Sequence, residues 1–271
     1  MNLPIERWYP AIFRRKSRRN FSTAIPESEK IAQLEKTCRE FRPFPEARAE
    51  LVKRSPREVF KGIIGRYGKV TGAPYYLAFI GQTSSPRVQE SVGYIGEALI
   101  LEATSLDLDT CWVGGFFRPE LVETHLSLSE GEKVLSVTPI GYAQDSDNFT
   151  ERSFKKFVHS AKRKTLKQLI IQGSTSSAWT EKALEAARLA PSAANRQPWR
   201  FQLEGESITI SLDSQKDAAT ISKRLDCGIA MLHLELGALA ADVAGIWEHL
   251  ENPRVARFTA KSASQLAKKS L

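Results

Sequence analysis

The sequence predicts an α+β protein made of two similar halves in one chain. Strands are expected at four apolar segments: 75–80, 134–141, 198–203 and 208–212. In the last of them, apolar residues stand at alternate positions. Two long segments, 91–106 and 227–243, are apolar on almost every side, which is typical of helices buried in a core. These kinds of segment recur in the same order, which indicates an internal duplication.

The duplication can be aligned in two blocks. Residues 93–96 and the apolar run after them match residues 228–231 and their run, so that Ala103 meets Ala238 and Asp107 meets Asp242. Upstream, residues 73–81 match residues 197–205. The two offsets, 135 (228 − 93) and 124 (197 − 73), differ by 11, which requires an insertion between the blocks. Chance similarity between apolar helices is the alternative, and the shared order of the blocks favours duplication. We place the halves at residues 1–170 and 171–271.

Shorter elements are expected outside these blocks. A helix should begin near Pro26 and run to about Phe41, because Pro and acidic residues favour a first helical turn. A basic loop is expected at 14–22, and a second helical stretch from 46 onward, after the break at 41–45. A strand should begin at Cys111 and end at 115, followed by a helix-capping turn at 129–132 and an Ala-rich helix at 179–190. The glycine pattern at 62–68 lacks the strand and helix that flank a dinucleotide loop, and we interpret it as a plain loop.

Composition excludes several classes of protein. The 271 residues are 42% hydrophobic and 26% charged, which is ordinary for a globular chain. No apolar run reaches the roughly 18 residues that a membrane span needs, and the N-terminal residues lack the order of a signal peptide. We therefore expect a cytoplasmic protein with no membrane partner.

Cysteine and histidine residues show no metal or disulfide spacing. Cys38, Cys111 and Cys227 lie far apart, and the four histidines are scattered. We expect no metal site, and thiols that are buried or inert. His233 and Glu235 interrupt an apolar helix, and a pair satisfied in the core or at the interface of the halves is favoured there over a catalytic pair.

Positive charge is concentrated in a few segments. The formal net charge is +8, with basic clusters at 14–19, 152–167 and 268–269. Such a balance is compatible with nucleic acid, a membrane surface, an anionic ligand or solubility alone. Two internal clusters that folding brings together favour a phosphate-bearing ligand. No known nucleic-acid-reading motif is present, so we expect no nucleic-acid partner.

Four stretches of the chain contain recognisable motifs. Residues 15–21 have the pattern Arg-x-Ser-x-Arg-x-Phe, and residues 190–201 contain Pro-Ser-x-x-Asn-x-Gln-Pro-Trp. They resemble the opening and the second signature of the nitroreductase family. Residues 126–143 resemble its late turn and central strand, and residues 162–166 the basic element that follows. Together the stretches cover most of residues 14–245.

The order of these stretches departs from that of an ordinary member, in which two identical subunits share two flavins. Here the first half has the basic loop, with residues 42–48 in place of the Pro-Ser-x-x-Asn segment, and the second half has that segment without an Arg-x-Ser-x-Arg loop. The chain thus resembles the single-chain, internally duplicated branch called putative TM nitroreductases. The resemblance implies a nitroreductase-like fold with a central, mostly antiparallel β-sheet flanked by helices. It also implies an intrachain pseudo-dimer with one flavin site, and hence a monomer.

The resemblance also implies which residues bind FMN. Arginine and serine side chains are geometrically matched donors for a phosphate, and a lysine near the flavin ring favours its reduced, negatively charged form. The residues carried over are Arg15, Lys16, Ser17, Arg19, Gly114, Gly115, Arg163, Pro191, Ser192, Ala193 and Asn195. Many relatives have an acidic residue where Gly114 stands. A solvated basic turn at 15–19 and a plain β-turn at 114–115 are the alternatives.

The implied activity is a ping-pong oxidoreduction. NADH or NADPH would reduce the flavin, and a small acceptor such as a nitroaromatic or a quinone would then take the electrons. The sequence offers no placed general acid, so the catalytic side chains stay unassigned. The alternative is an FMN-binding protein without reductase turnover, such as a carrier, a sensor or a vestigial enzyme.

Overall fold

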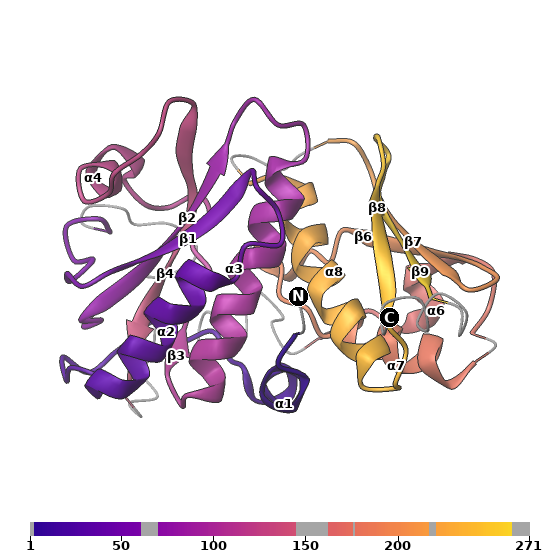
Figure 1. The fold of residues 1–271 in the computed structure, drawn as a ribbon, viewed down its shortest axis with the longest axis horizontal. Helices are drawn as coiled ribbons and strands as arrows, with labels where there is room; N and C mark the ends of the chain where they lie inside the picture. The colour runs from indigo at the N-terminus through magenta and orange to yellow at the C-terminus, as the bar shows by residue number, and fades with distance from the viewer. Residues whose placement is uncertain (1–2, 61–69, 145–161, 176, 217–220, 262–271) are drawn as a thin grey trace, which may run out of the picture.

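The computed structural model describes residues 3–60, 70–144, 162–175, 177–216 and 221–261. It has two lobes, each with its own β-sheet, and the two longest helices lie side by side between them (Figure 1). The first lobe contains α1 (Ile5–Arg14), α2 (Ser28–Glu40), β1 (Ala47–Val52), β2 (Tyr75–Gln82), α3 (Val88–Ser105), β3 (Asp109–Thr110), α4 (Pro119–Glu123) and β4 (Glu132–Gly141). The second contains α6 (Leu166–Leu169), β5 (Ile170–Gln172), α7 (Ala178–Arg188), the 3-10 turn Ala193–Asn195, β6 (Trp199–Glu204), β7 (Ser207–Leu212), α8 (Lys223–Leu239), β8 (Gly245–His249) and β9 (Arg254–Ala260).

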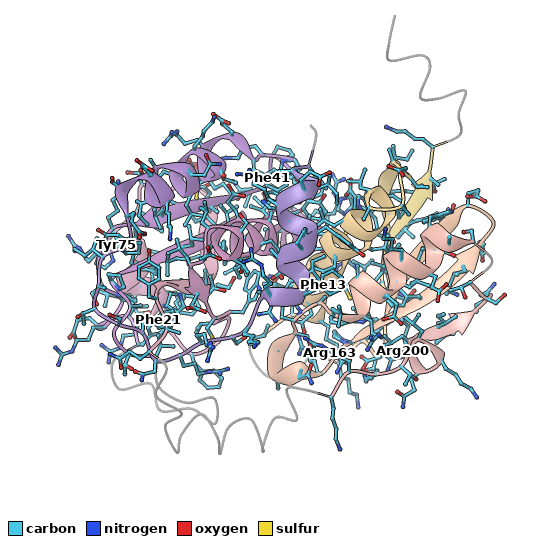
Figure 2. The ribbon with its side chains drawn as sticks, turned by 90° about the horizontal axis from the view of Figure 1, so that it is seen from below. Phe13, Phe21, Phe41, Tyr75, Arg163 and Arg200 are labelled. Atoms are coloured by element: carbon cyan, nitrogen blue, oxygen red, sulfur yellow. The ribbon has the colours of Figure 1, made fainter. Side chains whose placement is uncertain are left out.

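The predicted fold class is confirmed: antiparallel sheets are flanked by helices. The strands form two sheets rather than one, in the orders β1-β2-β4-β3 and β5-β6-β7-β9-β8. All pairs are antiparallel except β5 with β6. Two sheets form because the strands of each lobe pair with one another and not with those of the other lobe. Helix α1 contacts both α3 and α8, and Figure 2 shows it, with Phe13 near its end, at the junction of the lobes.

Strand order corrects part of the predicted alignment. Apart from β5, the second sheet repeats the first, because β6-β7-β9-β8 has the chain order and neighbours of β1-β2-β4-β3. Strand β2 therefore corresponds to β7, and the expected match of residues 73–81 with 197–205 is wrong. That match rested on a Pro-aromatic pair followed by an apolar run, and a local pattern of this kind contains no information about which neighbour a strand pairs with.

The downstream block of the alignment agrees with the structure. Asp107 and Asp242 both follow a helix end and both have a positive φ, 58° and 59°. The carbonyl of Ala103 accepts a hydrogen bond from the backbone N–H of Leu108 (2.9 Å), and that of Ala238 accepts one from Val243 (3.0 Å). The two helices therefore end in the same backbone geometry at the aligned residues. A common origin of the halves stays a prediction.

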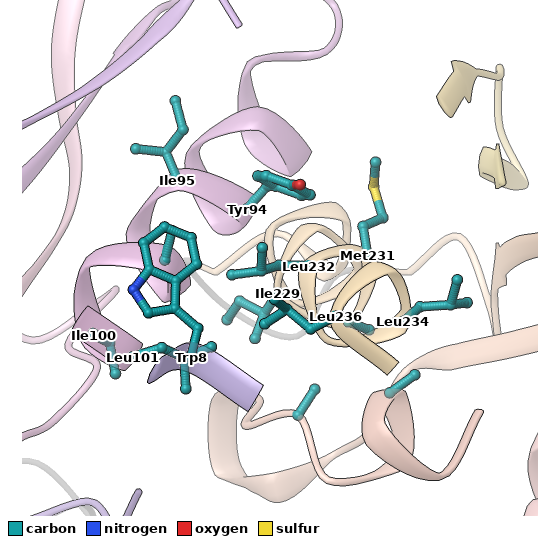
Figure 3. Close-up of a cluster of buried hydrophobic side chains, with 14 of the residues drawn as sticks. Trp8, Tyr94, Ile95, Ile100, Leu101, Ile229, Met231, Leu232, Leu234 and Leu236 are labelled. Atoms are coloured by element: carbon teal, nitrogen blue, oxygen red, sulfur yellow. The ribbon is translucent and has the colours of Figure 1, made fainter. Parts of the chain in front are cut away.

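Helices α3 and α8 cross with their backbones in contact. A Cβ atom at Gly93 would lie 2.0 Å from the carbonyl oxygen of Leu225, and one at Gly228 would lie 2.0 Å from that of Glu90. The two contacts are symmetric, since 228 − 93 and 225 − 90 are both 135. Figure 3 shows the apolar side chains that surround this crossing, among them Trp8 of α1.

Three local predictions are wrong. The stretch after Pro45 forms strand β1, because buried alanines (Ala47, Ala49) alternate with half-buried charged residues (Arg48, Glu50) and the segment pairs with β2. The strand expected from Cys111 lies at β3, and Val113 makes only an isolated bridge to Val137. The turn at 129–132 leads into β4 rather than a helix. The expected basic loop is also shorter, because Arg14 ends α1. The glycine pattern at 62–68 lies outside the described residues.

Four of the expected helices are present in the described part of the chain. The helices expected near 26–41, 91–106, 179–190 and 227–243 are α2, α3, α7 and α8. Within the described residues, no helix is both long enough and apolar enough to cross a membrane. No cluster of three or more potential metal ligands occurs among the described residues, and all three cysteines are free and buried.

The glycine crossing predicts that Gly93→Ala and Gly228→Ala each lower the free energy of unfolding by about 1–3 kcal/mol or more, because the added methyl meets backbone rather than a side chain that can rotate. Urea denaturation measures this. Gly205→Ala is the control for a methyl group added without a clash, because nothing lies within 4 Å of a Cβ at this position. Its positive φ makes alanine unfavourable there, so the control includes the cost of backbone strain alone. A loss at Gly93 no larger than that at Gly205 would argue against the tight crossing.

Burial of the thiols predicts slow modification. Burial raises the pKa of Cys38 to about 12 and that of Cys227 well above its usual range. The reactive thiolate is therefore scarce at neutral pH. We expect an aromatic disulfide reagent to label the native protein slowly and to label three thiols at once in denaturant. Rapid native labelling at pH 8 would contradict the buried placement.

Candidate functional site

Arg15 lies at the junction of the lobes, at the end of α1. Its backbone N–H donates to the carbonyl of Ala11 (2.9 Å), which closes the helix. Its side chain is only 8% exposed, and Nε lies 3.7 Å from Oε1 of Glu97 on α3. Nε is buried and has no hydrogen-bond partner among the described residues, whereas Nη1 lies 3.5 Å from Oγ of Ser17. Helix α1 thus delivers a guanidinium to the interior with donor capacity left over.

Arg163 is the second cation of this site. Its Nη1 donates to Oδ1 of Asn195, and its Nη2 donates to the carbonyl of Leu189 (3.0 Å). Burial lowers the pKa of Arg163 to about 10, with a further lowering by the charges of Arg15 and Arg188, and Glu97 opposes the shift. The partners of Arg163 among the described residues are uncharged, so two arginines share one nearby carboxylate. Such a site favours an anion.

The turn at 191–197 is built on left-handed backbone. Ala194, Asn195 and Gln197 have φ values of 51°, 54° and 49°, which residues other than glycine rarely adopt. Side chains hold the turn in place: Ser192 Oγ accepts from the Gln197 N–H (2.9 Å), and Asp226 accepts from the Ala193 N–H (3.0 Å). Short side chains at 192–194 leave the turn's backbone accessible to a flat ligand.

Residues 162–164 and the turn form one hydrogen-bonded unit. The Asn195 amide donates to the carbonyl of Lys162 (2.9 Å), and the Lys164 N–H donates to Oε1 of Gln197 (2.7 Å). Lys164 Nζ donates to the carbonyls of Arg196 and Gln197. The basic element and the Pro-Ser-x-x-Asn segment, some 30 residues apart in the chain, therefore act as a single structural piece.

Beneath Arg15, Glu97 is fully buried and held on both oxygens. Trp112 Nε1 donates to Oε2 (2.7 Å), and His233 Nε2 lies 2.9 Å from Oε1. His233 Nδ1 lies 3.0 Å from the carbonyl of Ala186. His233 and Glu235 are hydrogen-bonded in the core, as expected, but not to each other: Glu235 accepts from Tyr94 and Trp247 instead.

The remaining predicted residues lie on three separate segments. Lys16 and Ser17 are exposed beside Arg15. Arg19 lies further along the loop, where its carbonyl accepts from the Thr71 N–H (2.9 Å) of the first lobe. A Cβ on Gly114 would lie 3.4 Å from the side chain of Ile221, whose carbonyl accepts from Arg196. Gly115 follows it, and Pro191, which is buried, opens the turn.

Sequence reasoning missed Glu97 and Trp112. The available signal was a set of carboxylates, Glu90, Glu97 and Glu102, inside a helix that is otherwise apolar. Buried carboxylates require partners, and each of these has one or more. Which partner each would find depended on residues from other parts of the chain.

Comparison with known proteins identifies the relatives. The family model described as Putative TM nitroreductase matches residues 7–238. A putative nitroreductase from Thermotoga maritima has 19% identity and a TM-score of 0.57, with 96% of this chain and 94% of that chain covered. An FMN-dependent nitroreductase from Clostridium difficile has 17% identity and a TM-score of 0.42, with 54% of this chain and 95% of that chain covered. No curated protein matches.

The two-arginine site predicts stabilisation by small anions. Inorganic phosphate should raise the melting temperature of the wild type above that in chloride of equal ionic strength, because it supplies the missing negative charge. Arg163→Gln should lose most of this increase, because the positive charge that the phosphate would meet is gone. Arg14→Gln is the control, since Arg14 is exposed and pairs with Asp107. Equal phosphate effects in all three proteins would contradict an anion site at Arg163.

Proposed function

Because the chain belongs to the Putative TM nitroreductase family, we propose that it is an oxidoreductase that binds one FMN between its two lobes. The observation that carries the proposal is the convergence of Arg15 and Arg163, from segments almost 150 residues apart, beside the left-handed turn that contains Asn195. The proposed cofactor-binding residues are those that the family resemblance implies.

The residues present fit FMN chemically. A phosphate dianion suits two nearby guanidinium groups: that of Arg15, whose Nη1 makes a long 3.5 Å contact with Ser17, and that of Arg163, whose partners among the described residues are uncharged. The exposed hydroxyl of Ser17, next to Arg15, adds a neutral donor. An amide such as that of Asn195 can both donate and accept at the polar edge of the ring; in this structure its Oδ1 accepts from Arg163 and its Nδ2 donates to the carbonyl of Lys162.

The place in the first half that is equivalent to the turn at 191–195 is filled by side chains, which supports a single cofactor per chain. Residues 41–45 follow α2 as residues 191–195 follow α7. Phe41 and Phe44 pack against Tyr94 with ring centroids 6.3 and 5.2 Å apart, and Phe44 meets His249 at 5.4 Å. Aromatic side chains therefore occupy the position where the other half has a small, polar turn. With both halves in one chain, we also propose that the protein is a monomer.

When bound, FMN supplies hydride and electron transfer between a nicotinamide donor and an acceptor. The chain's own part is binding and electrostatics. Arg15, Ser17 and Arg163 hold the phosphate end, and Lys16 places a positive charge that favours a negatively charged ring. Gly114 and Gly115 contribute backbone without side chains. The donor we propose is NADH or NADPH, and the acceptor a small nitroaromatic or quinone that uses the same face in turn.

A second candidate is an FMN-binding protein without turnover. Gly114, in the position where many relatives have an acidic residue, is the observation that favours it. The two candidates share the cofactor and differ in whether the nicotinamide reacts.

The purified protein should show the visible absorption of an oxidised flavin, with one FMN per chain. Arg15→Gln and Asn195→Ala should each lower the FMN affinity about tenfold or more, because each removes a charge-assisted or amide hydrogen bond to the same molecule. Fluorescence titration of the apoprotein measures this, with Arg14→Gln as control. Full FMN affinity in both variants would refute the site.

Mixing the FMN-loaded protein with NADH or NADPH under anaerobic conditions should bleach the flavin absorption, and a quinone should restore it. Stopped-flow absorbance follows both half-reactions. A loaded protein that neither nucleotide bleaches would rule out the reductase and favour the carrier or sensor.

A further inference from the structure

Glu97 is the carboxylate against which Arg15 is held, and its surroundings recur around a second carboxylate. Trp247 follows Trp112 by 135 residues (247 − 112), the offset that relates Gly228 to Gly93. Trp247 Nε1 donates to Oε2 of Glu235 (2.7 Å), as Trp112 Nε1 donates to Oε2 of Glu97 (2.7 Å). Each carboxylate also has a partner on the opposite central helix.

These cross-helix partners differ in kind. Glu97 of α3 meets His233 of α8 at 2.9 Å, whereas Glu235 of α8 accepts from the hydroxyl of Tyr94 of α3 (2.7 Å). Burial raises the pKa of Glu235. An arginine ion pair is present at Glu97 and, within the described ranges, not at Glu235. The chain therefore contains two similar carboxylate environments, one with an arginine of the proposed FMN site and one without.

Hydrogen bonds fix the orientation of Glu97. Trp112 binds Oε2 and His233 faces Oε1, so the carboxylate cannot rotate without losing a buried partner. His233 is held in turn, because its Nδ1 lies 3.0 Å from the carbonyl of Ala186 and its Nε2 lies 2.9 Å from Oε1 of Glu97.

We propose that Glu97 is a positioning residue for FMN binding. Fixed by Trp112 and His233, it holds Arg15 from the Nε side, so that the Nη groups, on the side of Ser17, are available to the phosphate. The inference rests on the proposed function, because it assigns a role toward the cofactor of that site. Its counterpart Glu235 has a purely structural role.

The test compares Glu97→Gln with Glu235→Gln, each alone and combined with Arg15→Gln. In Glu97→Gln the amide can still bind Trp112 and His233, but an N–H group can replace the carboxylate oxygen in front of Arg15. We expect the FMN dissociation constant to rise about tenfold, the scale seen when a group that orients a binding side chain is removed. Riboflavin, which lacks the phosphate, should be affected less, and Glu235→Gln should bind FMN like the wild type.

A double-mutant cycle separates positioning from general damage. In the Arg15→Gln background, Glu97→Gln should add no further loss of FMN affinity, because the side chain that it positions is gone. Additive losses, or an FMN dissociation constant that is unchanged or lower in Glu97→Gln, would overturn the inference. Wild-type protein that binds neither FMN nor riboflavin would instead refute the proposed function itself.

A second pair of variants covers the case in which Glu97→Gln does not fold. Trp112→Phe keeps the carboxylate and removes the N–H that fixes it, and Trp247→Phe makes the same change at Glu235. We expect a rise of about threefold in the FMN dissociation constant for Trp112→Phe and none for Trp247→Phe. Equal effects of the two changes, after melting temperatures confirm folding, would show that Glu97 is structural only.

Discussion

The backbone contact between α3 and α8 is the constraint on which the rest of the structure depends. Gly93 and Gly228 allow each helix to approach the other's carbonyl groups, and any side chain at either position would separate them. At this distance the two lobes share one hydrophobic core, to which α1 adds Trp8. The same approach brings Glu97 of one helix to His233 of the other. A wider crossing would separate the groups of the site along with the helices.

Burying these helices also buries charge, and the way each charge is compensated explains the asymmetry of the molecule. Glu90 pairs with Arg224, and Glu97 pairs with Arg15, so each carboxylate on α3 joins distant parts of the chain. Among the described residues, Arg163 has no such carboxylate to itself, which leaves this part of the junction with surplus positive charge. The equivalent place near Tyr94 is closed by aromatic rings that need no charge at all. One half of the pseudo-symmetric pair is thus suited to an anion, and the other to packing.

Much of the fold could be predicted from the sequence, because helices and buried strands have periodic local patterns. The ends of α2, α3, α7 and α8 lay within a few residues of expectation. The errors share one cause. The stretch from residue 46 was predicted to be helical, but it pairs with β2 as a strand. Strand β2 was aligned with β6 from its local pattern, but its neighbours show that it corresponds to β7. Pairing is decided by residues distant in the chain, and no window of sequence contains it.

The sequence by itself determined the chemistry that the site draws on: a basic loop at Arg15–Arg19, a small polar turn at 191–195, and two long apolar helices that had to pack together. Only the tertiary structure decided that Arg163 binds Asn195. It also decided that Arg15 pairs with Glu97, which Trp112 and His233 hold in place. The physical reason is range. Residue type and periodicity act over a few positions, whereas the partner of a buried charge is set by which segments the close helix crossing brings together.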